Sequence, residues 1–127
     1  MFEATIEIPY LSGQLLGHLT EALTRIDLQH LRDHPSLPPL YRAGVRYERE
    51  AAGVERWASS PLVMRRGAGD CEDLACWRAA ELRMLGDPEA RVVSTSQRLS
   101  PRRRLYHVLV RRGDGQLEDP SRLLGMP

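Results

Sequence analysis

The sequence contains no lysine and no asparagine, so all eighteen residues counted as Lys or Arg are arginines. Without lysine, the chain cannot form a Schiff base on its own side chains or use a phosphate-binding loop of the lysine type. Without asparagine, a cysteine–histidine dyad would have to take its third member from aspartate, glutamate or glutamine.

Cysteine is scarce, and long apolar runs are absent. Two cysteines are too few for a disulfide scaffold. Cys71 and Cys76 fall in one helical pattern, where they would point about 140° apart and could not form a bridge. Residues 1–7 lack the basic leader of a signal peptide, and no stretch approaches the roughly 18 apolar residues of a membrane span. We therefore expect a cytoplasmic protein without a membrane partner.

The chain also lacks an excess of charge of either sign. Eighteen basic and seventeen acidic residues give a formal net charge of +1, which argues against nucleic acid as a partner bound by bulk attraction. The content of 42% hydrophobic and 28% charged residues is typical of a globular protein. A length of 127 residues fits one domain, so we expect a single domain over residues 1–127.

The first half of the chain predicts one strand and two helices. Residues 2–9 alternate apolar and polar side chains, as a half-buried strand does. Ser12 fits the N-cap of a helix that runs to about residue 33. Residues 45–58 carry a second helical pattern, which ends or kinks at Ser59-Ser60-Pro61.

The second half predicts one helix followed by antiparallel strands. Asp70 fits an N-cap, with Asp73 completing a capping box, and Gly86 ends this helix after about Leu85. The remaining elements are strands at 90–96, 105–111 and 116–119, a loop at 97–104 and a turn at 113–115. This order predicts an α+β fold in which N-terminal helices precede a helix packed on a small antiparallel sheet.

Cys71, expected in the first turn of the third helix, is a candidate nucleophile. Unpaired N–H groups at a helix start favour a thiolate, and the N–H of Cys71 could donate to an oxyanion. The neighbouring carboxylates of Asp70, Glu72 and Asp73 act in the opposite direction, because negative charge raises the pKa of a thiol. A cationic histidine, an arginine or a metal ion would have to offset them. The alternative of a buried structural cysteine fits Cys76 better.

His107 lies in the middle of the strongest predicted strand, as either a satisfied core histidine or a site residue. A three-residue turn at 113–115 would pair Arg112 with Gln116. It would bring Asp119 onto the face of His107, one diagonal step away, at about 7–8 Å between Cα atoms. A two-residue turn would put Asp119 on the opposite face. The Gly-Asp-Gly sequence favours the three-residue turn.

Together, a cysteine at a helix start, a strand histidine and an aspartate on the next strand suit nucleophilic acyl transfer. The thiolate attacks a carbonyl, the histidine moves the proton and the aspartate fixes the histidine tautomer. The same residues could instead bind zinc, but no fourth ligand stands at a recognisable spacing.

Three segments resemble the transglutaminase-like superfamily, and most of all its small bacterial and phage-borne cysteine-peptidase branch. The resemblance covers about residues 67–125, in family order, and implies a papain-like α+β fold. It further implies that Cys71 is the nucleophile, His107 the base and Asp119 the group that orients it. The segments are Gly69-Asp70-Cys71-Glu72-Asp73-Leu74-Ala75, Tyr106-His107-Val108 and Leu117-Glu118-Asp119-Pro120-Ser121.

Two further roles follow only from this resemblance. Trp57 stands where members of the superfamily place an aromatic near the oxyanion site, although a core tryptophan is the alternative. Asp70 and Glu72 match acidic residues that bind calcium in some adhesin-processing relatives. The alternative for this pair is helix capping and a favourable interaction with the helix dipole. We expect no obligatory cofactor.

We therefore predict a thiol-dependent peptidase or amidase that acts on a peptide or protein substrate. One alternative is a non-catalytic module that keeps the fold and binds an assembly partner in a phage-like particle or tail-like assembly. A second is a crosslinking acyl transferase, which lacks a recognisable amine-acceptor site here. The arginines at 102–104, with Arg98 and Arg111-Arg112, are either solvated loop residues or a contact for an acidic partner, phosphate or nucleic acid.

Overall fold

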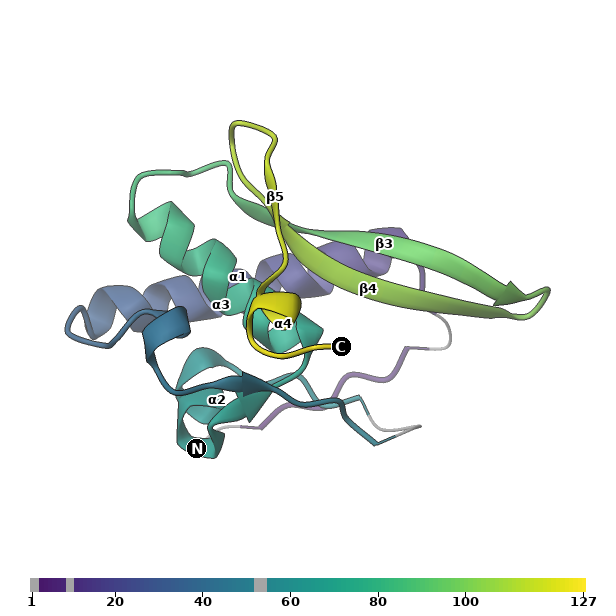
Figure 1. The fold of residues 1–127 in the computed structure, drawn as a ribbon, viewed down its shortest axis with the longest axis horizontal. Coiled ribbons are helices and arrows are strands. Elements are labelled where there is room, and N and C mark those ends of the chain that lie inside the picture. The colour runs from purple at the N-terminus through teal and green to yellow at the C-terminus, as the bar shows by residue number, and fades with distance from the viewer. Residues whose placement is uncertain (1–2, 9–10, 52–54) are drawn as a thin grey trace.

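The structure is a computed structural model, which describes residues 3–8, 11–51 and 55–127. It has an α+β architecture in which helices occupy most of the first two thirds of the chain and a three-stranded antiparallel sheet follows (Figure 1). The elements are α1 (Gly13–Asp33), a 3₁₀ turn η1 (Leu40–Arg42), β1 (Arg46–Tyr47), α2 (Ser60–Arg66), β2 (Ala68–Gly69), α3 (Cys71–Met84), β3 (Arg91–Ser100), β4 (Arg103–Arg111), β5 (Leu117–Glu118) and α4 (Pro120–Leu123).

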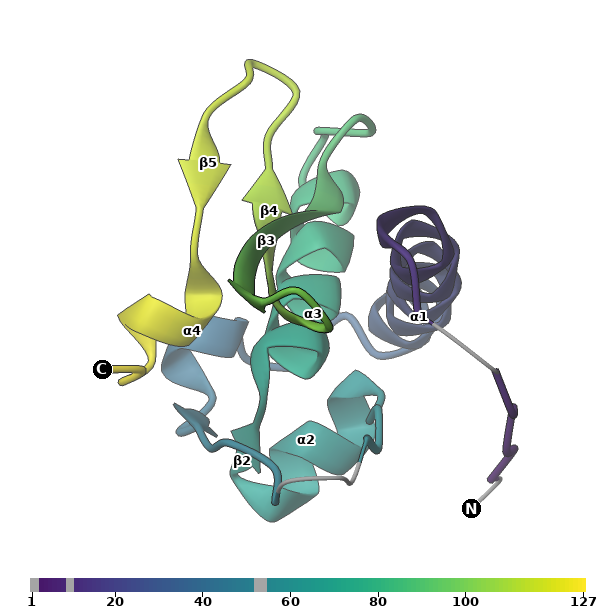
Figure 2. The ribbon, with the colours of Figure 1, turned by 90° about the vertical axis from the view of Figure 1, so that its right-hand side faces the viewer.

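Helix α3 is the centre of the core. Figure 2 shows it between α1 and the strands β3 and β4. Leu74 and Trp77 are fully buried in one apolar cluster with α2 and η1, while Ala75 and Ala79 pack in a second cluster with β4. The fixed position of α3 therefore also fixes the position of its first residue, Cys71.

The predicted helix ends are confirmed for α1 and α3. The Ser12 hydroxyl accepts a hydrogen bond from the Leu15 N–H at 3.1 Å. At the start of α3, Asp70 and Asp73 form the predicted capping box, each side chain accepting from the other's backbone N–H. The close approach here requires Gly69, because an added Cβ would lie 3.1 Å from the Cβ of Asp73.

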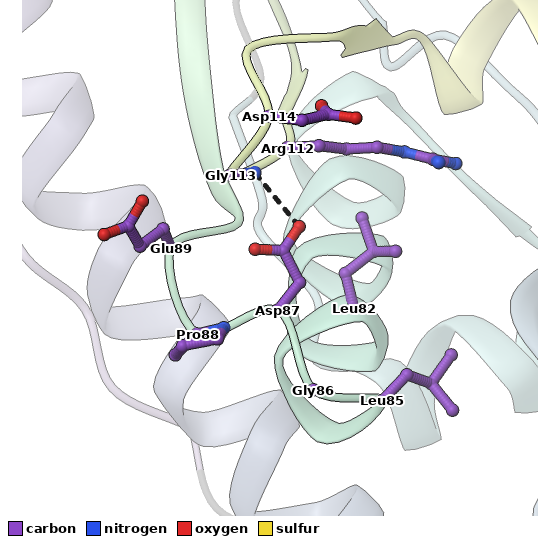
Figure 3. A pocket seen from close by; sticks show the side chains of 9 residues that line it. All are labelled: Leu82, Leu85, Gly86, Asp87, Pro88, Glu89, Arg112, Gly113 and Asp114. Carbon is purple, nitrogen blue, oxygen red and sulfur yellow. Dashed lines mark hydrogen bonds between the residues drawn. The ribbon is translucent and has the colours of Figure 1, made fainter.

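The predicted three-residue turn between β4 and β5 is confirmed. The Arg112 N–H donates to the Gln116 carbonyl at 2.8 Å, and Val110 pairs with Glu118. Gly113 lies against the C-terminal end of α3, where its N–H donates to Asp87 at 3.0 Å beside an open hollow of about 570 Å³ (Figure 3). The turn thus fixes the register that places Asp119 relative to β4.

The expected loop at 97–104 is wrong, because most of it is strand. The ladder between β3 and β4 continues to Arg98 opposite Arg104, and the arm that it forms projects past the helices (Figure 1). Solvent reaches much of this arm, and residues 94–99 are all exposed. The period-2 alternation of a half-buried strand is therefore missing there, although the backbone ladder persists.

Two of the three elements expected before Ser60, the strand at 2–9 and the helix at 45–58, are also wrong where the structure describes them. Residues 3–8 form no strand and are exposed, with Ile6 at 70% exposure. Residues 2 and 9 lie outside the described residues. In the segment expected as a helix at 45–58, Arg46 and Tyr47 instead pair in parallel with β2, and 48–51 and 55–58 are not helical.

The position of α2 explains part of this error. The helix begins at Ser60, and Pro61 lies in its first turn. Proline fits a helix start, where its missing N–H would have no partner, so Ser59-Ser60-Pro61 begins a helix instead of ending one. Residues 52–54 of the expected helix lie outside the described residues.

Among the helices that the structure describes, none has both the length and the apolar character to cross a membrane.

Strand β5 is held to the helices by Glu118. Its carboxylate accepts hydrogen bonds from Tyr41 at 2.6 Å and from the guanidinium groups of Arg78 and Arg112. Burial alone would raise the pKa of Glu118, but these donors outweigh burial and lower the pKa to about 2. The carboxylate is therefore ionised in the folded protein over nearly the whole pH range.

We predict that Glu118→Gln lowers the free energy of unfolding by about 2 kcal/mol at pH 7, because Arg112 loses its counter-charge and the largely buried Arg78 keeps only its longer contact with Glu81. The folded pKa is depressed, so the stabilisation is present above the ordinary pKa of 4.5 and is lost as the pH falls towards 2. Urea unfolding should therefore show that the free energy of unfolding falls less between pH 7 and pH 3 in the variant than in the unaltered protein.

The control is Glu48→Gln, since Glu48 is an exposed glutamate that pairs with Arg46. This change should cost at most about 1 kcal/mol. Equal unfolding free energies of the two variants at pH 7 would contradict the role given to Glu118.

Candidate active site

His107 and Asp119 form a hydrogen-bonded pair. The imidazole Nε2 lies 2.8 Å from Asp119 Oδ2, and the two side chains are 24% and 21% exposed. The register of β4 and β5 predicted this contact. Asp119 is held in place because it is also the N-cap of α4 and accepts from the Arg122 N–H. Since Asp119 occupies Nε2, the nitrogen left for another partner is Nδ1.

Cys71 lies against β4 at the residue next to His107. It is the first residue of α3 and packs against the apolar cluster that contains Val108, whose backbone N–H lowers the pKa of the Cys71 thiol. The Val108 nitrogen is bonded directly to the carbonyl carbon of His107, so the thiol lies near the His107 backbone. Among the described hydrogen bonds, none joins the Cys71 sulfur to the His107 ring.

The environment of Cys71 keeps its thiol protonated. Burial raises the pKa of Cys71 well above its ordinary value, and the negative charges of Glu72 and Asp70 raise it further. The Val108 N–H lowers the pKa, but by less than these effects raise it. The helix start was expected to favour a thiolate, but burial and the nearby carboxylates outweigh this effect. The expectation that the carboxylates raise the pKa of Cys71 is confirmed.

Two carboxyl groups near Cys71, those of Asp70 and Asp73, are largely protonated at neutral pH. Burial, a hydrogen bond with Glu72 and the charges of Glu72 and Glu50 raise the pKa of Asp70 to about 8. Burial and the neighbouring Asp70 raise the pKa of Asp73 to about 8. Protons bound to these two groups reduce the negative charge that faces the sulfur. Part of this charge is therefore neutralised without the cation that the sequence led us to expect.

Trp57 lies near this region. It packs against the same apolar cluster as Cys71 and Tyr106. The next residue, Ala58, donates its N–H to Asp73 at 2.7 Å and so ties this segment to the first turn of α3. The structure thus brings Trp57 to the neighbourhood of the predicted site, packed against part of the core.

One oxygen from each of Glu50, Glu55 and Asp70 lies within 4.8 Å of the others, which is a separation that can suit a calcium ion. Asp70 and Glu72 were the calcium-binding residues expected from the sequence, whereas Glu50 and Glu55 were not expected. No motif links these two residues to the third helix, because the chain path around β1 brings them there. Glu72 is not a member of this group; it lies close enough to Asp70 to raise the pKa of that carboxyl.

Comparison with family models, with curated proteins and with solved structures finds no match to this chain.

We predict that iodoacetamide modifies Cys71 faster than Cys76, because Cys76 is fully buried. The rate at Cys71 should rise steeply with pH above 7, since the raised pKa keeps the thiolate fraction small at neutral pH. Glu72→Gln removes a neighbouring negative charge, which we expect to lower the pKa of Cys71 and to speed labelling at pH 8 about 3- to 10-fold.

Peptide mapping by mass spectrometry measures both sites in one sample. Glu89→Gln is the matched control, because Glu89 lies beyond the other end of α3 and its change should leave the rate at Cys71 unaltered. A rate at Cys71 that is flat between pH 7 and 9, or equal rates in both variants, would contradict the electrostatic account of this thiol.

Proposed function

We propose that the protein is a thiol-dependent hydrolase that cleaves a peptide or amide bond, with a papain-like fold of the transglutaminase-like kind. Cys71 is the nucleophile, His107 the general base and Asp119 the group that orients it. The observation that carries the proposal is the 2.8 Å hydrogen bond between His107 and Asp119, formed next to Val108, which belongs to the apolar cluster that Cys71 packs against.

The first chemical step begins from a protonated thiol. As the Cys71 sulfur attacks the carbonyl carbon, its proton passes to Nδ1 of His107, and Asp119 at Nε2 stabilises the imidazolium that forms. The N–H of Cys71 has no partner within the helix, because it belongs to the first residue of α3, and it donates to the oxyanion. The imidazolium then protonates the leaving amine, and a thioester remains on Cys71.

The second step is hydrolysis of this thioester. About a fifth to a quarter of the His107 and Asp119 side-chain surfaces is exposed, so water can reach the base that activates it. The attack of water releases the acid and restores the thiol. This access to water favours hydrolysis over transfer of the acyl group to an amine, which would require that water be excluded.

A non-catalytic module of a phage-like or tail-like assembly is the second candidate. It is favoured by the raised pKa of Cys71 and by the fact that none of the described hydrogen bonds joins the Cys71 sulfur to the His107 ring. In that role the protein would keep the fold and bind an assembly partner. The two candidates differ in whether an electrophilic peptide probe modifies Cys71 in a way that depends on His107.

We predict that Asp119→Asn lowers the rate of amide hydrolysis, or of modification by an electrophilic peptide probe, by about 100-fold or more, because the imidazolium loses its charged partner. Asparagine is also a good N-cap, so α4 should stay intact and the melting temperature should change little. The measurement is the rate for the variant and for the unmodified chain at equal concentration, with a thermal melt of each.

The controls are Cys71→Ala, which should lose all modification while it keeps its melting temperature, and Asp114→Asn. Asp114 is an exposed carboxylate in the β4–β5 turn, so its change should leave the rate unaltered. A full rate in Asp119→Asn, or modification in Cys71→Ala, would refute the proposed triad and favour the assembly module.

A further inference from the structure

The far half of the β3–β4 arm carries a basic groove of about 280 Å³, which we name the arginine groove. Arg98, Arg102 and Arg104 line it, and Tyr106 lies at the end nearer the core. These arginines were expected in a loop, but Arg98 and Arg104 lie directly opposite each other on the paired strands β3 and β4.

The three guanidinium groups are available to a ligand. All three residues are exposed, and none of them forms an ion pair with any carboxylate that the structure describes. Arg104 donates only to the Ser96 hydroxyl, at 3.3 Å. In contrast, Arg78 and Arg83, which pack against the core, are paired with glutamates. Several like charges gathered in one groove favour an anionic partner.

The arginine groove leads towards Cys71. Arg104, Tyr106 and Val108 share one face of β4, because alternate side chains of a strand point the same way. Tyr106 packs against the same apolar cluster as Cys71, and Val108 is a member of that cluster, so β4 meets Cys71 in a contact near Val108. At a rise of about 3.3 Å per residue, Arg104 lies roughly 13 Å along the strand from this contact, which is the length of about four residues of an extended peptide.

The outer edge of β4 offers a path for such a peptide. Strand β5 pairs with β4 only at Val110 and Arg111. Within the described residues, the part of β4 from Arg104 to His107 therefore has a ladder partner on one side only. An extended peptide can add to a free strand edge of this kind.

We propose that the arginine groove is the subsite that selects substrates with acidic side chains about four residues from the bond that is cleaved. This inference rests on the proposed function. The preference applies only at that distance, because an acidic side chain next to the cleaved bond would meet the carboxyl groups of Asp70 and Glu72 beside Cys71. The ligand is thus a polypeptide with acidic residues set apart from a neutral cleavage site.

Binding to the intact Cys71→Ala chain tests the proposal without turnover. Three fluorescein-labelled peptides of eleven residues serve as probes: one with glutamates in the outer two positions at each end, one with glutamines there, and one with glutamates only in the three central positions. Acidic groups at both ends make the test independent of the direction in which the peptide binds. Fluorescence anisotropy gives the dissociation constants at 0.15 M salt.

We expect the end-acidic peptide to bind about 10-fold more tightly than either of the others, since each exposed ion pair contributes modestly. Arg98→Gln with Arg104→Gln should abolish the difference. The matched control, Arg65→Gln with Arg66→Gln, removes the same charge from exposed arginines of α2 and should preserve it. Equal binding of the end-acidic and glutamine peptides would overturn the proposal.

Two further outcomes separate this inference from its rivals. Tighter binding of a twelve-residue oligothymidylate than of the end-acidic peptide, at the same salt, would overturn it in favour of a nucleic-acid site. In the chain that retains Cys71, the substitutions Arg98→Gln and Arg104→Gln should leave iodoacetamide labelling of Cys71 unchanged. If Cys71 is not labelled faster than Cys76 while the end-acidic peptide still binds, the proposed function fails and the groove is a docking surface, not a substrate subsite.

Discussion

The buried carboxylate of Glu118 is the interaction on which the candidate site depends. It joins β5 to α3 through Arg78 and to η1 through Tyr41. The backbone alternates along this short strand, so the residue after Glu118 points to the other face, where Asp119 meets His107. Two paired residues are a weak strand by themselves. Charged hydrogen bonds on one face therefore hold the aspartate that orients the histidine on the other.

The charge around Cys71 is set by competition among groups that cannot all ionise. Asp70 and Asp73 cap α3 out of water, so burial raises the pKa of both; the charges of Glu72 and Glu50 raise that of Asp70 further, and the charge of Asp70 raises that of Asp73. Their first function is structural, because they hold the start of the helix and tie it to Ala58. The same arrangement leaves them partly protonated, and this limits their effect on the sulfur.

Local chemistry predicted the parts of the fold that depend on neighbours in sequence. The capping box at Asp70 and the turn at 113–115 each depend on residues only a few positions apart. The length of that turn also predicted the contact of His107 with Asp119. The failures depend on distant partners. The alternation in residues 3–8 has no strand beside it to pair with, whereas Arg46 and Tyr47 leave their helical pattern to pair with β2. For the acidic cluster, no local pattern brings Glu50 and Glu55 to Asp70.

A high thiol pKa is compatible with the proposed chemistry, because negative surroundings penalise only the free thiolate. Once the Cys71 sulfur has attacked a carbonyl, the negative charge lies on the oxyanion and not on the sulfur, and it disappears when the protonated amine leaves and the neutral thioester forms. The proton must then leave as the new bond forms, which requires a neutral imidazole at rest with Nδ1 open. The bond from Asp119 to Nε2 provides that tautomer, and the charge of Asp119 acts when the imidazolium appears. The site therefore fits proton transfer during attack better than an ion pair formed in advance.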